Sequence, residues 1–160
     1  MTTDLLPGLE LTALRAWLDA ELPGRLTGDL SAELITGGRS NLTYVLSAGG
    51  ERVVLRRPPV GQLLATAHDM AREGRVMHAL RGTDVPVPSV LAQCPDPSVL
   101  GAPFYVMELV EGEAYRRKGE IAHWGPELTA SVSGRLVDVL TDLHAVDPSE
   151  VGLQDLGRPD

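Results

Sequence analysis

Several residue types that build common kinds of site are scarce in this sequence. Cys94 is the only cysteine, so the chain can form neither an internal disulfide nor a cysteine-based zinc site. Lys118 is the only lysine, and its context, Arg-Arg-Lys-Gly, is not that of a P-loop lysine. No apolar run approaches the ~18 residues that a membrane helix requires. These shortages exclude disulfide scaffolds, P-loop enzymes and membrane-spanning helices.

The balance of charge excludes a further class, the general nucleic-acid binders. The 160 residues carry 22 acidic and 14 basic side chains, a net charge of −8, whereas nucleic-acid binding needs a basic face. The first ten residues have neither the basic start nor the apolar core of a signal peptide. We therefore expect a soluble, cytoplasmic protein of about one domain's size, with no nucleic-acid or membrane partner.

Hydrophobic periodicity and turn residues predict the order helix, three strands, helix, two strands, connector, helix. The predicted elements are helix 9–22, strands 31–35, 42–47 and 51–57, helix 62–80, strands 90–94 and 104–110, and helix 126–145. Short turns between the first three strands, such as Ala48-Gly49-Gly50, predict an antiparallel meander. Five strands with a packed helix favour an α+β fold.

The same signals divide the chain into three predicted segments. Residues 1–29 form an N-terminal helical segment, residues 30–112 form the α+β lobe, and residues 113–160 form a connector with the last helix. The apolar stripe of that helix has no later element of this chain to cover it. Since a large uncovered patch normally marks an interface, we expect a second copy or a partner chain to cover residues 126–145.

A glycine pair, Gly37-Gly38, stands between two predicted strands. Dinucleotide-binding and P-loop motifs need a helix after their glycines, so this position excludes both. A glycine-rich turn between strands lets backbone N–H groups approach phosphate oxygens closely, and Ser40 and Asn41 add short polar groups. An ordinary hairpin that binds nothing is the alternative.

A second candidate is Arg56, which lies in the apolar strand Val53-Val54-Leu55-Arg56. Successive side chains of a strand point to opposite faces, so Arg56 faces away from Leu55 and is expected to meet an anion there. Glu73, on the long helix that follows, is the expected carboxylate partner. The alternative is that Arg56 caps a sheet edge and Glu73 is a solvated helix residue.

Taken together, these features resemble the amino-terminal lobe of kinase-like phosphotransferases, specifically the aminoglycoside phosphotransferase and choline kinase superfamily. The double proline after Arg56-Arg57 is most similar to the branch found beside acyl-CoA dehydrogenase domains. The matching motifs cover nearly the whole chain and follow one another in the order and spacing of the family. The matching motifs are Gly37-Gly38-Arg39-Ser40-Asn41-Leu42-Thr43-Tyr44, Val54-Leu55-Arg56-Arg57-Pro58-Pro59, Arg72-Glu73-Gly74-Arg75-Val76-Met77, Pro86-Val87-Pro88, Phe104-Tyr105-Val106-Met107-Glu108-Leu109-Val110-Glu111-Gly112 and Leu143-His144-Ala145-Val146-Asp147.

The resemblance implies a five-stranded antiparallel nucleotide-binding lobe (residues 30–112), a hinge, and the first helix of a helical second lobe that is incomplete here. It implies ATP and Mg²⁺ as cofactors and a small-molecule hydroxyl as the acceptor. It places Arg56, paired to Glu73, where kinases usually carry a lysine that meets the α- and β-phosphates. The implied nucleotide-binding residues are Gly37, Gly38, Ser40, Asn41, Arg56 and Glu73 for the phosphates and Met107, Glu108 and Val110 for the adenine.

One part of the family pattern is missing from this sequence. Phosphoryl transfer of this class uses a catalytic-loop aspartate, an asparagine shortly after it and a second aspartate for Mg²⁺. None of the four histidines is followed by Gly-Asp, and Asn41 is the only asparagine. We therefore expect no catalytic residue and no metal ligand in this chain, and no turnover by it alone. The alternative is a non-catalytic nucleotide-binding or protein-interaction module, a truncated paralogue.

Overall fold

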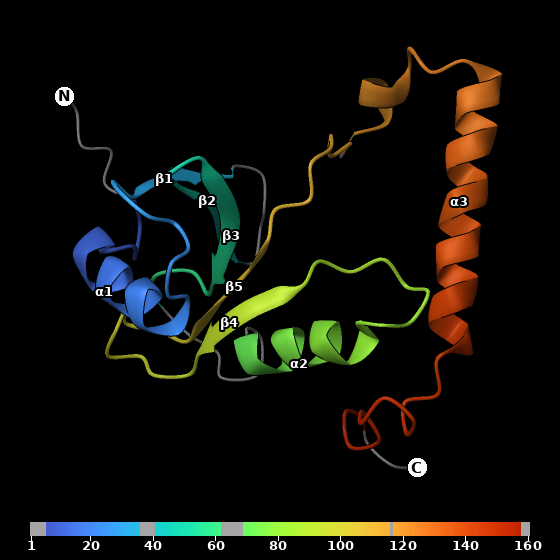
Figure 1. The fold of residues 1–160 in the computed structure, drawn as a ribbon. Coiled ribbons are helices and arrows are strands. Elements are labelled where there is room, and N and C mark those ends of the chain that lie inside the picture. The colour runs from blue at the N-terminus through green and yellow to red at the C-terminus, as the bar shows by residue number, and fades with distance from the viewer. Residues whose placement is uncertain (1–5, 36–40, 62–68, 116, 158–160) are drawn as a thin grey trace. The chain divides into compact units, whose positions relative to one another are not determined.

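The computed structural model describes residues 6–35, 41–61, 69–115 and 117–157. The order of helices and strands is the predicted one, with a short 3-10 helix, η1, added in the connector (Figure 1). The elements are α1 (Leu11–Glu21), β1 (Ser31–Leu34), β2 (Leu42–Ala48), β3 (Glu51–Arg57), α2 (Met70–Leu80), β4 (Val90–Cys94), β5 (Phe104–Glu108), η1 (Lys118–Ile121) and α3 (Pro126–Ala145).

The five strands form one antiparallel sheet in the order β1-β2-β3-β5-β4, which confirms the predicted α+β architecture. The first three strands are the expected meander. β5 then inserts between β3 and β4, and its register sets Tyr105 directly opposite Arg56. Since residues opposite each other in a ladder share a face, this pairing brings the two side chains together.

The turn between β2 and β3 depends on its two glycines. Gly49 and Gly50 have φ values of 58° and 83°, the left-handed conformation that a two-residue hairpin turn requires. A Cβ at Gly49 would also lie 2.4 Å from the backbone oxygen of Thr27. The turn therefore fixes the β2–β3 register, in which Thr43 lies opposite Arg56.

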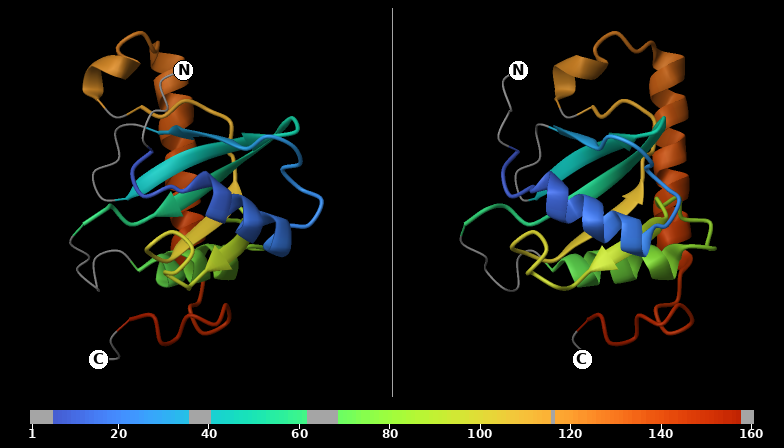
Figure 2. Two further views of the ribbon diagram at one scale, coloured as in Figure 1. Left: turned by 90° about the vertical axis from the view of Figure 1, so that its left-hand side faces the viewer. Right: turned by 60° about the vertical axis from the view of Figure 1, so that its left-hand side comes forward.

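α1 packs on one face of the sheet and forms the core with it (Figure 2). Leu14 and Leu18 of the helix are buried against strand side chains such as Leu46, Leu55 and Val106. Each such leucine contributes about 1.5–3 kcal/mol of burial free energy. The face that carries Leu55 is thereby filled, and the opposite face carries Arg56.

α2 begins later than the periodicity predicts. Residues 62–68 lie outside the described residues, and Asp69 is not helical but caps α2, which starts at Met70. The Arg72 N–H donates to Asp69 Oδ1 (2.9 Å), and the Glu73 N–H donates to the Asp69 carbonyl (3.0 Å). The prediction was wrong at Asp69 because a short acidic side chain satisfies the free N–H groups of a first turn better than it continues a helix.

β5 ends at Glu108, two residues before the predicted end at Val110. Its ladder with β3 stops at the pair Val53–Glu108, so Leu109 and Val110 leave the sheet. α1 is likewise shorter than predicted, because the Glu10 carboxylate caps it by accepting the N–H groups of Thr12 (2.9 Å) and Ala13 (2.6 Å). These differences are confined to element ends, where local hydrogen bonds compete with the periodic pattern.

The chain divides into two compact units, residues 1–78 with 88–109 and residues 79–87 with 110–160. The first contains the sheet and α1. The second contains η1 and α3, which runs from Pro126 to Ala145 as predicted, with proline at its first position. In the described part of the chain, no helix combines the length and the apolar character needed to cross a bilayer.

Candidate functional site

Arg56 and Arg57 are adjacent in β3 and lie on opposite faces of the sheet. Arg57 is buried (3% exposed), and its guanidinium donates to the backbone carbonyls of Leu100 (2.9 Å), Pro58 (3.1 Å) and Gly8. Burial lowers the pKa of Arg57 below its usual value. This arginine therefore joins three backbone segments inside the core, and Arg56 is the one available to a ligand.

Arg56 pairs with Glu73, as the sequence predicts. Arg56 Nε lies 2.9 Å from Glu73 Oε2, and the two side chains are 33% and 37% exposed. Glu73 reaches the sheet from the first turn of α2, whose start is set by the Asp69 cap. The pair thus joins the central strand of the sheet to the helix beside it.

Glu73 accepts two further hydrogen bonds, which the sequence does not predict. Asn41, just before β2, donates from Nδ2 to Glu73 Oε1 (3.1 Å). The Tyr105 hydroxyl, from β5, donates to Oε2 (3.1 Å). Both carboxylate oxygens are therefore engaged, and donors from the start of β2, from β3 and from β5 converge on one residue of α2.

Tyr105 is the buried member of this cluster, with 2% of its surface exposed. Burial, together with the nearby Glu73 carboxylate, raises the pKa of Tyr105 well above its usual value. Its hydroxyl therefore stays protonated at physiological pH and acts as a donor to Glu73.

A cavity of about 320 Å³ lies against the Arg56–Glu73 pair. Met77 of α2, Pro88, Tyr105 and Met107 of β5 complete its wall. Its size falls within the ~300–1,000 Å³ typical of small-molecule pockets, and its lining has their usual character, mostly apolar with few charged groups. The cavity can hold a flat apolar group beside a cationic guanidinium.

The predicted adenine-binding residues occupy different environments. Met107 lines the cavity. Glu108 ends β5, where its backbone N–H donates to the Ser89 carbonyl (2.9 Å) and its carboxylate accepts the Ser89 N–H (3.1 Å). Val110 lies beyond the strand, and its side chain is 69% exposed. The Glu108 N–H therefore already donates within the protein.

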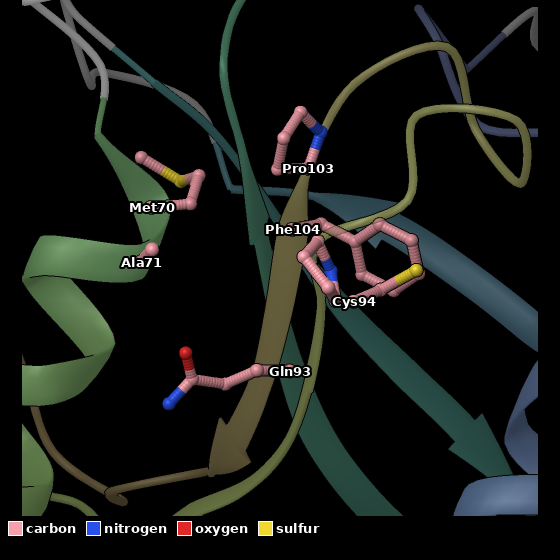
Figure 3. A pocket seen from close by; sticks show the side chains of 7 residues that line it. Met70, Ala71, Gln93, Cys94, Pro103 and Phe104 are labelled. Carbon is pink, nitrogen blue, oxygen red and sulfur yellow. The ribbon is translucent and has the colours of Figure 1, made fainter.

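A second, smaller cavity is lined by the start of α2, the end of β4 and the start of β5. Figure 3 shows Met70 and Ala71 of α2, Gln93 of β4 and Pro103 among the side chains that line it. The volume of this cavity is about 130 Å³. Its described lining carries no charged side chain, and its volume is below that of typical ligand pockets. Next to it, Gly74 lies against the end of the Gln93 side chain, where an added Cβ would lie 2.8 Å from Gln93 Cδ. This small cavity therefore lies at the contact between α2 and β4 and is separate from the Arg56–Glu73 pair.

Three of the predicted phosphate-binding residues, Gly37, Gly38 and Ser40, lie outside the described residues. The described residues contain no group of three or more histidine, cysteine, aspartate or glutamate side chains placed to hold a metal ion. Within the cluster, the Glu73 carboxylate is already held by Arg56, Asn41 and Tyr105. The described residues therefore contain no preformed cluster of metal ligands, and the Glu73 carboxylate is occupied by protein donors.

Sequence reasoning missed Tyr105, Met77 and Pro88 as parts of the site. The alternation Phe104-Tyr105-Val106 indicates that Tyr105 faces away from the core. That it faces Arg56 follows only from the β3–β5 pairing, which joins strands that are not consecutive.

Comparison with known proteins gives relatives along nearly the whole chain. Acyl-CoA dehydrogenase family member 11 of Gallus gallus is 38% identical over 149 residues, which is 91% of this chain and 19% of that protein. Acyl-CoA dehydrogenase family member 10 of Mus musculus is 35% identical over 146 residues, again 91% of this chain and 14% of that protein. The chain thus spans about a fifth or less of these relatives, in keeping with the resemblance to the branch beside acyl-CoA dehydrogenase domains.

A solved structure has the same fold. The crystal structure of a Ralstonia eutropha protein assigned to the aminoglycoside phosphotransferases superposes with a TM-score of 0.77 at 35% identity, covering 94% of this chain and 42% of that one. The model of the phosphotransferase enzyme family matches residues 31–160. The sheet, the helix that carries Glu73 and these similarities agree, and the chain belongs to the phosphotransferase enzyme family.

Proposed function

We propose that this chain is the ATP-binding part of a small-molecule phosphotransferase, one that transfers the γ-phosphoryl group of ATP to a hydroxyl acceptor. The observation that carries the proposal is the Arg56–Glu73 ion pair at the wall of a 320 Å³ cavity. The positively charged guanidinium of Arg56 beside a mostly apolar pocket suits a ligand that has a flat base and negatively charged phosphates. Family membership supports the same reading.

In this proposal, Arg56 neutralises charge on the phosphates. A guanidinium presents five N–H donors in a planar fork, so Arg56 can bond Glu73 through Nε and offer other N–H groups to phosphate oxygens. A lysine has a single ammonium group for both partners. Glu73 orients the fork, and Met107 together with the Glu108 carbonyl and the Val110 backbone seats the adenine.

The glycine segment is assigned by resemblance alone. Gly37, Gly38 and Ser40 would bring backbone and hydroxyl donors to the phosphates, and Asn41 would end this loop. The sequence holds no His-Gly-Asp motif, and the described residues contain no preformed cluster of metal ligands. We therefore propose binding, without turnover, for residues 1–160.

Isothermal titration with ATP tests the proposal. Arg56→Ala is expected to weaken ATP binding about 10-fold to 100-fold, because it removes a charged donor worth about 1.5–3 kcal/mol. Arg52→Ala, an exposed arginine of the same strand, is the matched control and should bind ATP like the wild type. Equal ATP affinity of Arg56→Ala and wild type would overturn the proposal, and ATP hydrolysis by the purified wild-type chain would overturn the absence of turnover.

A protein-interaction module is the second candidate function. The observation in its favour is a set of exposed apolar side chains along α3, none of whose residues is buried. They are Leu128, Val132, Leu136, Val137, Leu140 and Leu143. The two functions are compatible, since this surface and the Arg56 cavity are formed by different residues.

A further inference from the structure

The Arg56–Glu73 ion pair by itself contributes little free energy toward holding the two side chains in one geometry. Both side chains are about one-third exposed, and ion pairs of this kind contribute little because solvent screens them and ordering two long side chains costs entropy. A phosphate site that depends on the direction of Arg56 therefore needs something more rigid to fix Glu73.

Tyr105 has the properties of that anchor. The Tyr105 ring is buried, so the surrounding side chains already hold it in one conformation. The β3–β5 register places it opposite Arg56. Its hydroxyl donates to Glu73 Oε2 (3.1 Å), the same oxygen that accepts Arg56 Nε (2.9 Å). The carboxylate oxygen thus lies between a fixed phenol and the guanidinium that it orients.

Asn41 fixes the other end of the carboxylate. Its Nδ2 donates to Oε1 (3.1 Å), which leaves the carboxylate little freedom to rotate. Asn41 is also the residue that follows the Gly37–Ser40 segment. The orientation of Glu73 is therefore tied both to β5, through Tyr105, and to the end of the glycine segment.

We propose that Tyr105 is a positioning residue of the nucleotide site, which acts through Glu73 to aim the Arg56 guanidinium at the phosphates. This inference rests on the proposed function and adds to it a residue that touches neither phosphate nor acceptor. A substitution at Tyr105 should therefore affect the binding of ATP and of adenosine differently. ATP needs an oriented Arg56, whereas adenosine, which has no phosphate, does not.

The test compares Tyr105→Phe with Tyr44→Phe by titration with ATP and with adenosine. Tyr44 is the matched control, because it is also a buried tyrosine whose hydroxyl donates one hydrogen bond, to the Pro7 carbonyl (2.6 Å), on the face that contacts α1. Tyr105→Phe keeps the ring that lines the cavity and removes only the hydroxyl, so it is expected to weaken ATP binding about threefold to tenfold and to leave adenosine binding unchanged. Tyr44→Phe should change neither affinity.

The Glu73→Ala variant distinguishes a positioning role of the Tyr105 hydroxyl from a purely structural one. In Glu73→Ala, adding Tyr105→Phe should cause no further loss of ATP affinity, because the hydroxyl acts only through the carboxylate. Equal weakening of ATP and adenosine by Tyr105→Phe, or an undiminished effect in Glu73→Ala, would show a structural role and overturn the proposal.

A measurement without nucleotide separates this inference from the proposed function. The Arg56 Nε–H signal in a ¹H–¹⁵N spectrum should shift or broaden in Tyr105→Phe and not in Tyr44→Phe. If the wild-type chain bound no ATP, the proposed function would fail, and this signal alone would decide whether Tyr105 positions Arg56. An unchanged Arg56 signal in Tyr105→Phe would overturn the positioning role.

Discussion

Because side chains alternate along β3, the guanidinium of Arg57 lies in the core, and that of Arg56 lies on the opposite face of the sheet, where it contacts Glu73 of α2. The two residues have the same chemistry but different surroundings. Arg57 donates to three backbone carbonyls, whereas Arg56 meets a carboxylate beside a cavity. At the residue scale, the function of each arginine is thus decided by which face of β3 it occupies.

Substitution of the two arginines by methionine should separate stability from binding. Arg57→Met leaves buried carbonyls without their donor, at about 1–3 kcal/mol for each unsatisfied group, so we expect a loss of about 3 kcal/mol of unfolding free energy. Arg56→Met should cost less than about 1 kcal/mol, because its ion pair is about one-third exposed to solvent, and should still weaken ATP binding. Urea unfolding measures the first effect and ATP titration the second. Similar stability losses in both variants would contradict this assignment.

At the scale of elements, the position of α2 is what makes the cluster possible. The Asp69 cap determines where the helix starts and therefore which residue of its first turn reaches Arg56. At Gly74 the helix lies against the end of the Gln93 side chain of β4. A helix begun elsewhere, or held farther from the sheet, would not bring Glu73 within hydrogen-bond distance of both β3 and β5.

Gly74→Ala tests how firmly that packing is held. A Cβ at Gly74 meets only the far end of the Gln93 side chain, which is exposed and can rotate away. Alanine favours a helix by about 1 kcal/mol over glycine, so we expect the variant to be more stable by about 0.5–1 kcal/mol in thermal unfolding, with ATP affinity unchanged. A destabilised variant would show that the α2–β4 contact cannot adjust. Weakened ATP binding would show that α2 has moved Glu73.

At the scale of the whole molecule, the sheet and α3 present different surfaces. The sheet is covered on one face by α1, and its other face carries the candidate nucleotide site. α3 carries exposed apolar side chains, of which Leu136 and Val137 are 69% and 61% exposed. Exposed apolar surface of this kind favours association.

Size-exclusion chromatography at several concentrations tests that consequence. We expect the wild-type chain to elute larger than a monomer as its concentration rises, and Leu136→Gln to shift the elution toward the monomer. Ser131→Gln, an exposed position on a different side of α3, is the matched control and should elute like the wild type. If the wild-type chain eluted as a monomer at every concentration, the proposal that α3 provides a protein-interaction surface would be contradicted.

The sequence by itself determined the order of elements and the class of fold. These depend on local spacing, since alternation shows which strand residues share a face and periodicity shows which residues form helices. The pairing of Arg56 with Glu73 was predicted through the family resemblance, and the structure confirms it. The element ends at Asp69 and Glu108 were misplaced, because a cap and the end of a ladder depend on single hydrogen bonds. Gly37, Gly38 and Ser40 stay predictions, as does every nucleotide contact.

Only the tertiary structure decided that Tyr105 and Asn41 also hold Glu73 and that a cavity lies beside the pair. The strand order β3-β5-β4 is the reason. It pairs β3 with β5, which are not consecutive in the chain, and such pairing is selected by how side chains fill the space between sheet and helices. Local sequence patterns do not contain that information, so the residues that orient Arg56 could be found only once the chain was folded.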